Sequence, residues 1–343
     1  MNRRRFICRL ALGTLSAPRV VAAQPARKVY RIGILSASAV TSDLVGPQPR
    51  SAYTGALLRG LSELGYVYGE HFVTEPRGGG GTPGRFSDLA AELVRLRVDV
   101  IVAGGPALAA LKQATSAIPI VMVGTGDPVG AGFVQSLAHP GGNITGLSLQ
   151  STELMGKRLE LLKELVPGPA PVAVLWHRAS LRSWQAAEAA ARERGWKLLS
   201  LEIRDAGEIE GAFKLATGAR AGTVFVFAGG FFDPHARRIV ELAVKSRLPT
   251  MYSLRHFVEA GGLISYSADL TALYQRAAVF VDKILKRAKP ADLPVGKADA
   301  PSAETGTVLR PGTLGHYAQE AGFRRVEILA IGNLFFRFYR LYA

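Results

Sequence analysis

Cysteine is nearly absent from the sequence, and long apolar runs are absent altogether. The single cysteine, Cys8, lies within the first 23 residues, which have the pattern of a cleaved export signal. A mature chain without thiols has no disulfide, no cysteine-based metal site and no cysteine nucleophile. No apolar stretch approaches the roughly 18 residues that span a bilayer, so we expect the mature protein to be soluble.

Signatures of metal, nucleophile and nucleotide chemistry are also missing. The six histidines show no metal-ligand spacing, and no Gly-x-Ser-x-Gly elbow occurs. The glycine-rich loop 78–84 lacks the Gly-Lys-Ser/Thr ending of a phosphate-binding loop, and we predict a flexible surface connection there. Residues 124–130 superficially resemble a dinucleotide fingerprint, but the third glycine comes one position late and Pro128 interrupts the turn. We therefore expect no cofactor and no metal.

Acidic residues are scarce relative to basic ones. The 42 Lys and Arg residues against 27 Asp and Glu give a formal charge of +15, and five of the arginines precede Gln24. The remaining excess of about +10 is interspersed with acids, as in 157–160, rather than clustered with aromatic residues. We expect a solvated basic surface and no nucleic-acid partner.

The first 23 residues resemble an export signal. Arginines at 3–5 form a positive segment, 6–15 is mostly apolar, and 21–23 provides small residues before a cleavage point. The arginines also fit the twin-arginine pattern, although lysine is missing after them. An ordinary basic amphipathic helix is the alternative. Export would place the mature protein in the periplasm, which suits a chain without thiols.

The rest of the chain alternates short apolar strands with amphipathic helices. Strands are predicted at 30–35, 71–75, 98–103, 118–123, 144–147, 172–176, 197–203, 223–227, 249–253 and 263–266. Helices are predicted at 51–64, 86–96, 107–115, 153–165, 181–194, after Asp205, and at 233–246, 256–260 and 269–287. Such alternation predicts parallel sheets with right-handed crossovers. The strands are too many for one sheet, so we predict an α/β fold with two Rossmann-like lobes and an interlobe cleft.

The strand and turn at 118–130 are the clearest pointer to a site. A run of apolar residues ends abruptly in glycines, an aspartate and a proline, which indicates a strand buried on both faces and a tight turn. Ligands of open α/β sheets bind beyond the carboxyl ends of the strands. Asp127 could therefore pair with an ammonium group, and the equally favoured alternative is a turn aspartate that bonds its own backbone.

Several motifs occur in the order of a known family. They are LSELGYV (61–67), LAAELVRL (89–96), GDPV (126–129), PGGNITG (140–146), GKRLELLKE (156–164), EAGGL (259–263), DKIL (282–285) and KPADLPV (289–295). Together they resemble the ABC transporter substrate-binding proteins, of the kind related to tryptophan- and other amino-acid-binding periplasmic components. The resemblance covers about residues 29 to 295.

The resemblance implies a type I periplasmic-binding-protein fold, in which two lobes close on a ligand by hinge motion. It also implies that the late helix returns to the first lobe. The expected organisation is a signal peptide at 1–23, a first lobe of 29–147 plus 267–295, a second lobe of 148–266 and an atypical tail at 296–343.

The sequence departs from the family pattern in three places. Residues 176–178 are Trp-His-Arg where Trp-Asn-Pro is common, and 228–231 lacks the aspartate often found after that strand. Both turns are expected to face the cleft. In the tail, 314–329 and 335–341 look like the last helix and strands of a Rossmann-like methyltransferase whose glycine-rich cofactor loop is missing. A gene fusion or frameshift explains such an end, and a divergent natural C-terminus is the alternative.

An amino-acid-like ligand needs amides or hydroxyls for its carboxylate, an acid for its ammonium and apolar walls for its side chain. Serines and helix-terminal amides at two strand ends suit the carboxylate. The aromatic candidates are equally expected in the core, and Asp269 is expected first as a helix N-cap. The candidate ligand-binding residues are Ser36, Ser38, Gly105, Pro106, Ala107, Gly126, Asp127, Trp176, His177, Gly230, Phe231, Tyr266 and Asp269.

The sequence therefore predicts a periplasmic solute-binding component of an ABC import system. It would bind a small polar, amino-acid-like ligand in the cleft and deliver it to a permease in the inner membrane, as a monomer and without catalysis. A ligand-sensing protein that docks on a membrane receptor would share this sequence. A nucleotide-dependent enzyme is the least favoured alternative, because no acid, base or metal constellation supports it.

Overall fold

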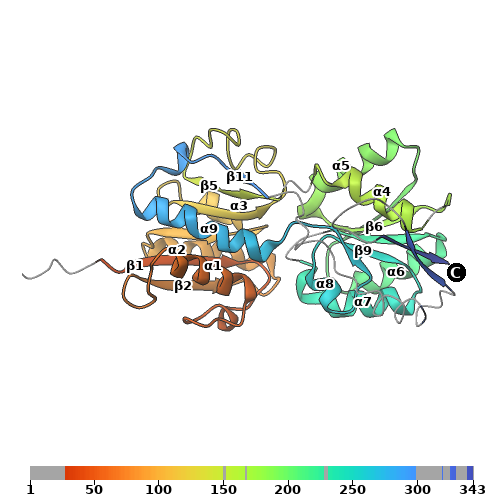
Figure 1. Cartoon of the computed structure of the whole chain (residues 1–343), viewed down its shortest axis with the longest axis horizontal. Helices are drawn as coiled ribbons and strands as arrows, with labels where there is room; N and C mark the ends of the chain where they lie inside the picture. The colour runs from red at the N-terminus through yellow and green to blue at the C-terminus, as the bar shows by residue number, and fades with distance from the viewer. Residues whose placement is uncertain are drawn as a thin grey trace, which may run out of the picture.

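A computed structural model of the chain describes residues 28–149, 152–166, 168–227, 231–298, 319, 325–329 and 338–342. The predicted export signal therefore lies outside the described residues, as does most of the predicted tail. Two α/β lobes lie side by side (Figure 1). Lobe 1 is defined here as the six-stranded sheet with its helices, and lobe 2 as the five-stranded sheet with its helices. Every strand pair within these two sheets is parallel, as the alternation of strands and helices predicts.

The sheet of lobe 1 has the strand order β11-β5-β4-β3-β1-β2. Its strands are β1 (Tyr30–Ser36), β2 (Phe72–Gly78), β3 (Val100–Ala103), β4 (Ile120–Thr125), β5 (Ile144–Ser148) and β11 (Gly296–Lys297). The short β11 pairs with β5, so the segment predicted as an atypical tail begins inside this sheet.

Helices cover both faces of the lobe 1 sheet. They are α1 (Ala52–Glu63), α2 (Phe86–Arg95), α3 (Ala107–Ala114) and α9 (Leu270–Leu285), with the 3-10 turns η1 (Thr41–Asp43) and η2 (Pro83–Arg85). Successive side chains of a strand point to opposite faces. Val100 and Val102 accordingly pack with α1 and α9, whereas Ile101 and Ala103 pack with α2 and α3. This burial on both faces explains why the strands are nearly continuous apolar runs.

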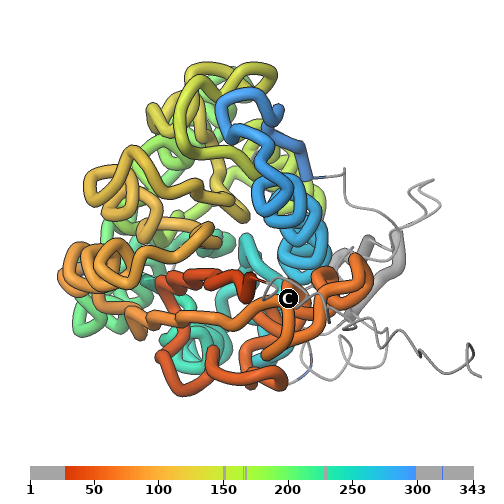
Figure 2. The backbone as a smooth tube through the Cα atoms, turned by 90° about the vertical axis from the view of Figure 1, so that its left-hand side faces the viewer, coloured from red at the N-terminus to blue at the C-terminus, as the bar shows by residue number. Residues whose placement is uncertain are grey.

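The late helix α9 completes lobe 1, although the whole of lobe 2 precedes it in the chain. Figure 1 shows α9 in blue on the lobe formed by the first part of the chain, and Figure 2 shows it beside α1. The two helices approach closely at Gly60 of α1. A Cβ atom there would lie 2.4 Å from the backbone oxygen of Gln275 and 2.9 Å from the Cβ of Ala278. Only a residue without a side chain permits this distance.

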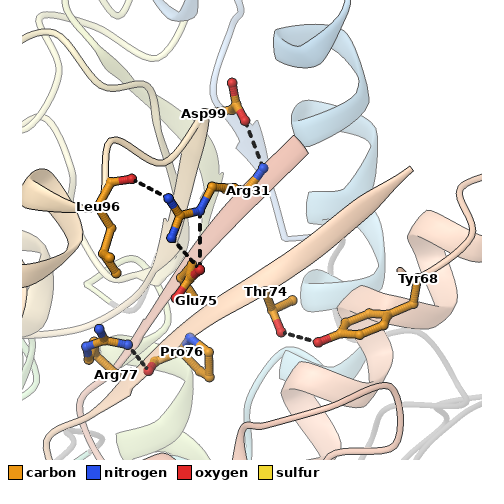
Figure 3. Close-up of polar contacts among 8 residues, drawn as sticks. All are labelled: Arg31, Tyr68, Thr74, Glu75, Pro76, Arg77, Leu96 and Asp99. Atoms are coloured by element: carbon orange, nitrogen blue, oxygen red, sulfur yellow. Dashed lines mark hydrogen bonds and ion pairs between the residues drawn. The ribbon is translucent and has the colours of Figure 1, made fainter. Parts of the chain in front are cut away.

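A polar cluster links β1 to β2 at the edge of the lobe 1 sheet, near the start of both strands (Figure 3). The Arg31 guanidinium donates to Glu75 Oε1 from Nη2 at 2.6 Å and to the Leu96 carbonyl from Nη1 at 3.0 Å. The Arg31 amide donates to Asp99 Oδ2 at 2.8 Å. One arginine therefore links β1, β2 and the turn that leads into β3.

The glycine-rich loop after β2 is packed more tightly than predicted. The amides of Gly79, Gly80 and Gly81 donate to backbone carbonyls of residues 36–39 at 2.8–3.1 Å. A Cβ on Gly79 would lie 2.3 Å from the ring of Phe86. The glycines therefore serve close backbone approach.

Lobe 2 repeats the same architecture with the strand order β10-β9-β8-β6-β7. Its strands are β6 (Val172–His177), β7 (Leu198–Ile203), β8 (Thr223–Val226), β9 (Thr250–Tyr252) and β10 (Ile264–Ser265). Its helices are α4 (Met155–Leu165), α5 (Leu181–Glu193), α6 (Glu208–Gly218), α7 (Ala236–Lys245) and α8 (His256–Glu259), with 3-10 turns η3 (Arg178–Ser180) and η4 (Asp233–His235). Helices α4 and α5 cover one face, and α6, α7 and α8 cover the other.

Beyond the two lobes, the strands β12 (Arg325–Leu329) and β13 (Phe338–Tyr342) form an antiparallel pair. β13 approaches α4 of lobe 2. The 3-10 turn η5 (Pro290–Asp292) precedes β11. In the parts of the chain that the structure describes, no helix is both long and apolar enough to cross a membrane.

The close approach of α1 and α9 predicts a contrast between two glycines of the same helix. Gly60→Ala should lower the free energy of unfolding by about 1–3 kcal/mol, because the new methyl group meets a backbone oxygen that cannot move aside. Gly55→Ala should raise it by about 0.5 kcal/mol, because its methyl group would meet only the flexible Arg59 side chain, 3.5 Å away. Denaturant unfolding followed by circular dichroism measures both. Equal effects of the two substitutions would contradict the packing described here.

Candidate functional site

A cavity of about 540 Å³ lies between the lobes. Lobe 1 contributes the end of β1 and the first turn of α1, and lobe 2 contributes the segments that follow β8 and β9. The connection at 267–271, which carries the chain from β10 into α9, forms a further wall. The carboxyl ends of parallel strands share one edge of a sheet, so both lobes present their turns to this space.

Lobe 2 supplies an acid–imidazole contact to the cavity. Asp233 begins η4, the turn that leads into α7, and His256 begins α8. Asp233 Oδ1 lies 3.4 Å from His256 Nε2. Both atoms are shielded from solvent and have no hydrogen-bond partner within the described part of the chain. The contact is too long for a well-formed hydrogen bond, so both polar atoms keep unused bonding capacity at the cavity wall.

Lobe 1 supplies an aromatic pair. The rings of Tyr53 (α1) and Tyr274 (α9) stack with centroids 5.3 Å apart and planes 15° apart. Burial, with the Asp233 carboxylate next in importance, raises the pKa of the Tyr274 hydroxyl to about 12. The same two causes raise the pKa of Tyr53 above its usual range, and Glu259 and Asp269 add to the rise. Both hydroxyls therefore stay protonated at neutral pH, in a region of negative potential.

The N-terminus of α1 also faces the cavity. Ser51 caps this helix by accepting a hydrogen bond from the Thr54 amide at 3.3 Å. The first amides of a helix have no partner within the helix, and its positive end favours anions. Arg50, whose side chain is exposed, lies directly before the cap. This corner of the cavity suits a carboxylate.

Carboxylates outnumber guanidinium groups around the cavity. Arg255 pairs with Glu259 at 3.1 Å within the segment that forms α8. The acids that line the cavity are Asp43, Asp233, Glu259 and Asp269, and the arginines are Arg50 and Arg255. The cavity as a whole therefore favours a cationic group on its ligand.

Three of the predicted residues line this cavity: Ser36, Ser38 and Asp269. Ser36 Oγ accepts from the Ala39 amide at 3.1 Å. Asp269 caps α9, as predicted, because its Oδ1 accepts from the amides of Thr271 and Ala272 at 2.7 and 3.2 Å.

The predicted residues at the ends of β3 and β4 do not line it. Asp127 Oδ1 accepts from the Gly130 amide at 2.8 Å, which is the backbone-bonded turn that the sequence offered as an alternative. Its Oδ2 lies 3.6 Å from an Nη atom of Arg182 on α5, so this pair joins the two lobes. Gly126 shares this turn. Gly105, Pro106 and Ala107 form the start of α3, where Ala107 is fully buried.

The predicted aromatic residues of lobe 2 belong to other contacts. Trp176 is buried, donates from Nε1 to Ser200 Oγ at 2.8 Å and stacks on Trp184 with centroids 5.5 Å apart. His177 stacks on Phe231 at 4.5 Å, and burial lowers the pKa of this imidazole. Tyr266 packs on the same face as α4. Gly230 lies outside the described residues.

Most of the cavity lining was not predicted from the sequence, and four of these residues stand out: Tyr53, Tyr274, His256 and Asp233. Tyr53 and Tyr274 belong to helices far apart in the chain, and their contact leaves no sequence signal. His256 lies in a helix of one turn. Asp233 did leave a signal, because an Asp-Pro pair just after a strand of a parallel sheet stands at the ligand-binding edge. It was interpreted as a helix cap alone.

Comparisons with known proteins agree with this architecture. Residues 39–303 match the family described as ABC transporter substrate binding protein. A tyrosine-binding protein of Clostridioides difficile is 24% identical over 261 residues, which are 75% of this chain and 74% of that protein.

Solved structures with a similar fold agree with the family match. A domain from Streptococcus pneumoniae in complex with L-Trp has a TM-score of 0.72 and 26% identity, over 86% of this chain and 95% of its own. A conserved domain protein from Vibrio cholerae has a TM-score of 0.73 and 24% identity, over 84% of this chain and 98% of its own. The fold is the type I periplasmic-binding-protein fold, as predicted. With two lobes around a cavity and a family match over most of its length, the chain belongs to the ABC transporter substrate-binding proteins.

Proposed function

We propose that this protein is the solute-binding component of an ABC import system and takes an amino-acid-like ligand in the interlobe cavity. The observation that carries the proposal is the lining of that cavity, in which both lobes contribute charged groups of both signs beside a stacked tyrosine pair. Its volume of about 540 Å³ suits a small organic molecule.

The two ends of an amino acid match two parts of the cavity. The carboxylate fits the N-terminus of α1 and Arg50, where amides and a guanidinium are donors. The ammonium group fits the acidic part of the wall, and a ring or apolar side chain fits against Tyr53 and Tyr274. Two relatives, named for tyrosine and solved with L-Trp, support an aromatic amino acid as the first ligand to test.

The proposal includes the sequence-based expectations on delivery and location. The units that close on the ligand are proposed as 29–147 with 267–295 and as 148–266. The loaded protein would pass its ligand to an inner-membrane permease after export to the periplasm. Recognition and release need no bond to be made or broken, so the proposal assigns no catalysis to the cavity.

Ligand binding should raise the stability of the purified protein. Free ligand at a hundred times its Kd adds about 2.7 kcal/mol to the free energy of unfolding. Differential scanning fluorimetry with L-tyrosine, L-tryptophan and the other amino acids should show a rise in Tm of several degrees for at least one of them. A neutral sugar is the control and should give no shift. A well-folded protein that responds to no amino acid would contradict the proposal.

The aromatic pair predicts a further contrast. Tyr53→Ala should weaken binding of an aromatic amino acid about two- to tenfold, because it removes a stacking surface. Tyr53→Phe keeps the ring and should retain most of the affinity. Tyr68→Ala, a lobe 1 tyrosine away from the cavity lining, is the matched control and should leave the affinity unchanged. Isothermal titration calorimetry measures all three, and equal losses for Tyr53→Ala and Tyr68→Ala would exclude a specific role of the pair.

A further inference from the structure

We propose that Asp233 receives the ammonium group of the ligand, the role that the sequence assigned to Asp127. The inference deepens the proposed function, on which it rests, by naming the residue and the chemical class that it selects. The class is an organic amine with an aromatic or apolar body, for which the ammonium group contributes more to affinity than the carboxylate.

The bonding of Asp127 leaves it a poor acceptor for a ligand. One carboxylate oxygen accepts from the Gly130 amide, and the other faces the Arg182 guanidinium. A second cation at Asp127 would compete with this guanidinium for the same oxygen. Asp127 is also absent from the cavity lining.

The carboxylate of Asp233, unlike that of Asp127, remains open to a ligand. Among the described residues no lysine or arginine pairs with its carboxylate, and the basic group in contact with it is the His256 imidazole. Its Oδ1 is shielded from solvent and accepts no hydrogen bond from any residue that the structure describes. A shielded carboxylate oxygen without a donor is unfavourable, and an ammonium group brings three donors and the opposite charge. The side chain remains 20% exposed and lines the cavity, so a ligand can reach it.

Two of the other cavity acids are already paired. Glu259 pairs with Arg255, and Asp269 caps α9. Asp43 is the remaining competitor. It is not among the charges that raise the pKa of Tyr53, whereas Asp233 is the first of them after burial itself. Asp233 is therefore the acid whose field acts most strongly on the aromatic pair.

The aromatic pair and Asp233 together define a cation site. An ammonium group beside Asp233 would share the cavity with the stacked rings of Tyr53 and Tyr274, and the faces of aromatic rings attract cations. His256 packs against Phe257 with ring centroids 4.5 Å apart, and its Nε2 lies 3.4 Å from Asp233 Oδ1.

Three compounds with the same ring test the chemical class on the unmodified protein. They are L-tyrosine, tyramine, which lacks the carboxylate, and 3-(4-hydroxyphenyl)propionate, which lacks the ammonium group. Calorimetry should show that tyramine keeps more of the affinity of tyrosine than the propionate does. The reverse order would overturn the assignment while leaving the proposed function intact. If neither an amino acid nor an amine binds, the assignment of Asp233 and the proposed function are both contradicted.

Substitutions then locate the acceptor. Asp233→Asn removes the charge at nearly constant shape and should weaken tyrosine and tyramine about ten- to a hundredfold, but not the propionate. Glu241→Gln, on the exposed side of α7, is the matched control for a general charge effect. It should not change the affinity for any of the three compounds. Circular dichroism checks that each variant is folded. A larger loss for Asp43→Asn or Asp127→Asn than for Asp233→Asn would overturn the assignment.

Discussion

The polarity of the parallel strands is the constraint on which the site depends. Every strand of a parallel sheet ends at the same edge, so each lobe collects its strand-terminal turns on one side. The end of β1 and the segments that follow β8 and β9 meet at the interlobe cavity, and the turn after β4 meets α5 of lobe 2 through Asp127 and Arg182. The position of the binding cavity thus follows from the direction of the strands, whatever side chains line it.

The approach of α1 and α9 then determines the aromatic wall of the cavity. Because Gly60 has no side chain, α1 can approach the backbone oxygen of Gln275 on α9. Tyr53 and Tyr274 stack at the ends of the same helices that face lobe 2. A packing detail inside lobe 1 is therefore coupled to the geometry that a ligand meets.

Much of the fold could be predicted from the sequence because its signals are local. Apolar runs that stop at glycines marked the strands, and Ser51 and Asp269 marked the helix starts that the structure shows. The site was only partly predictable. Ser36, Ser38 and Asp269 follow from strand ends and caps, whereas the contacts of Tyr53 with Tyr274 and of Asp233 with His256 depend on how elements distant in sequence pack. Asp127 shows the converse, because a conspicuous turn residue is taken up by its own backbone and by the opposite lobe.

The return of α9 to lobe 1 has a consequence for the order in which the chain becomes foldable. During synthesis from the N-terminus, β1 to β5 emerge first with α1, but the part of the sheet face that α9 covers beside α1 stays uncovered until residues 270–285 appear. Lobe 2 has all five of its strands by residue 265. The lobe that begins first is thus the last to be complete, and its uncovered apolar face is the surface that a chaperone would have to protect in the growing chain.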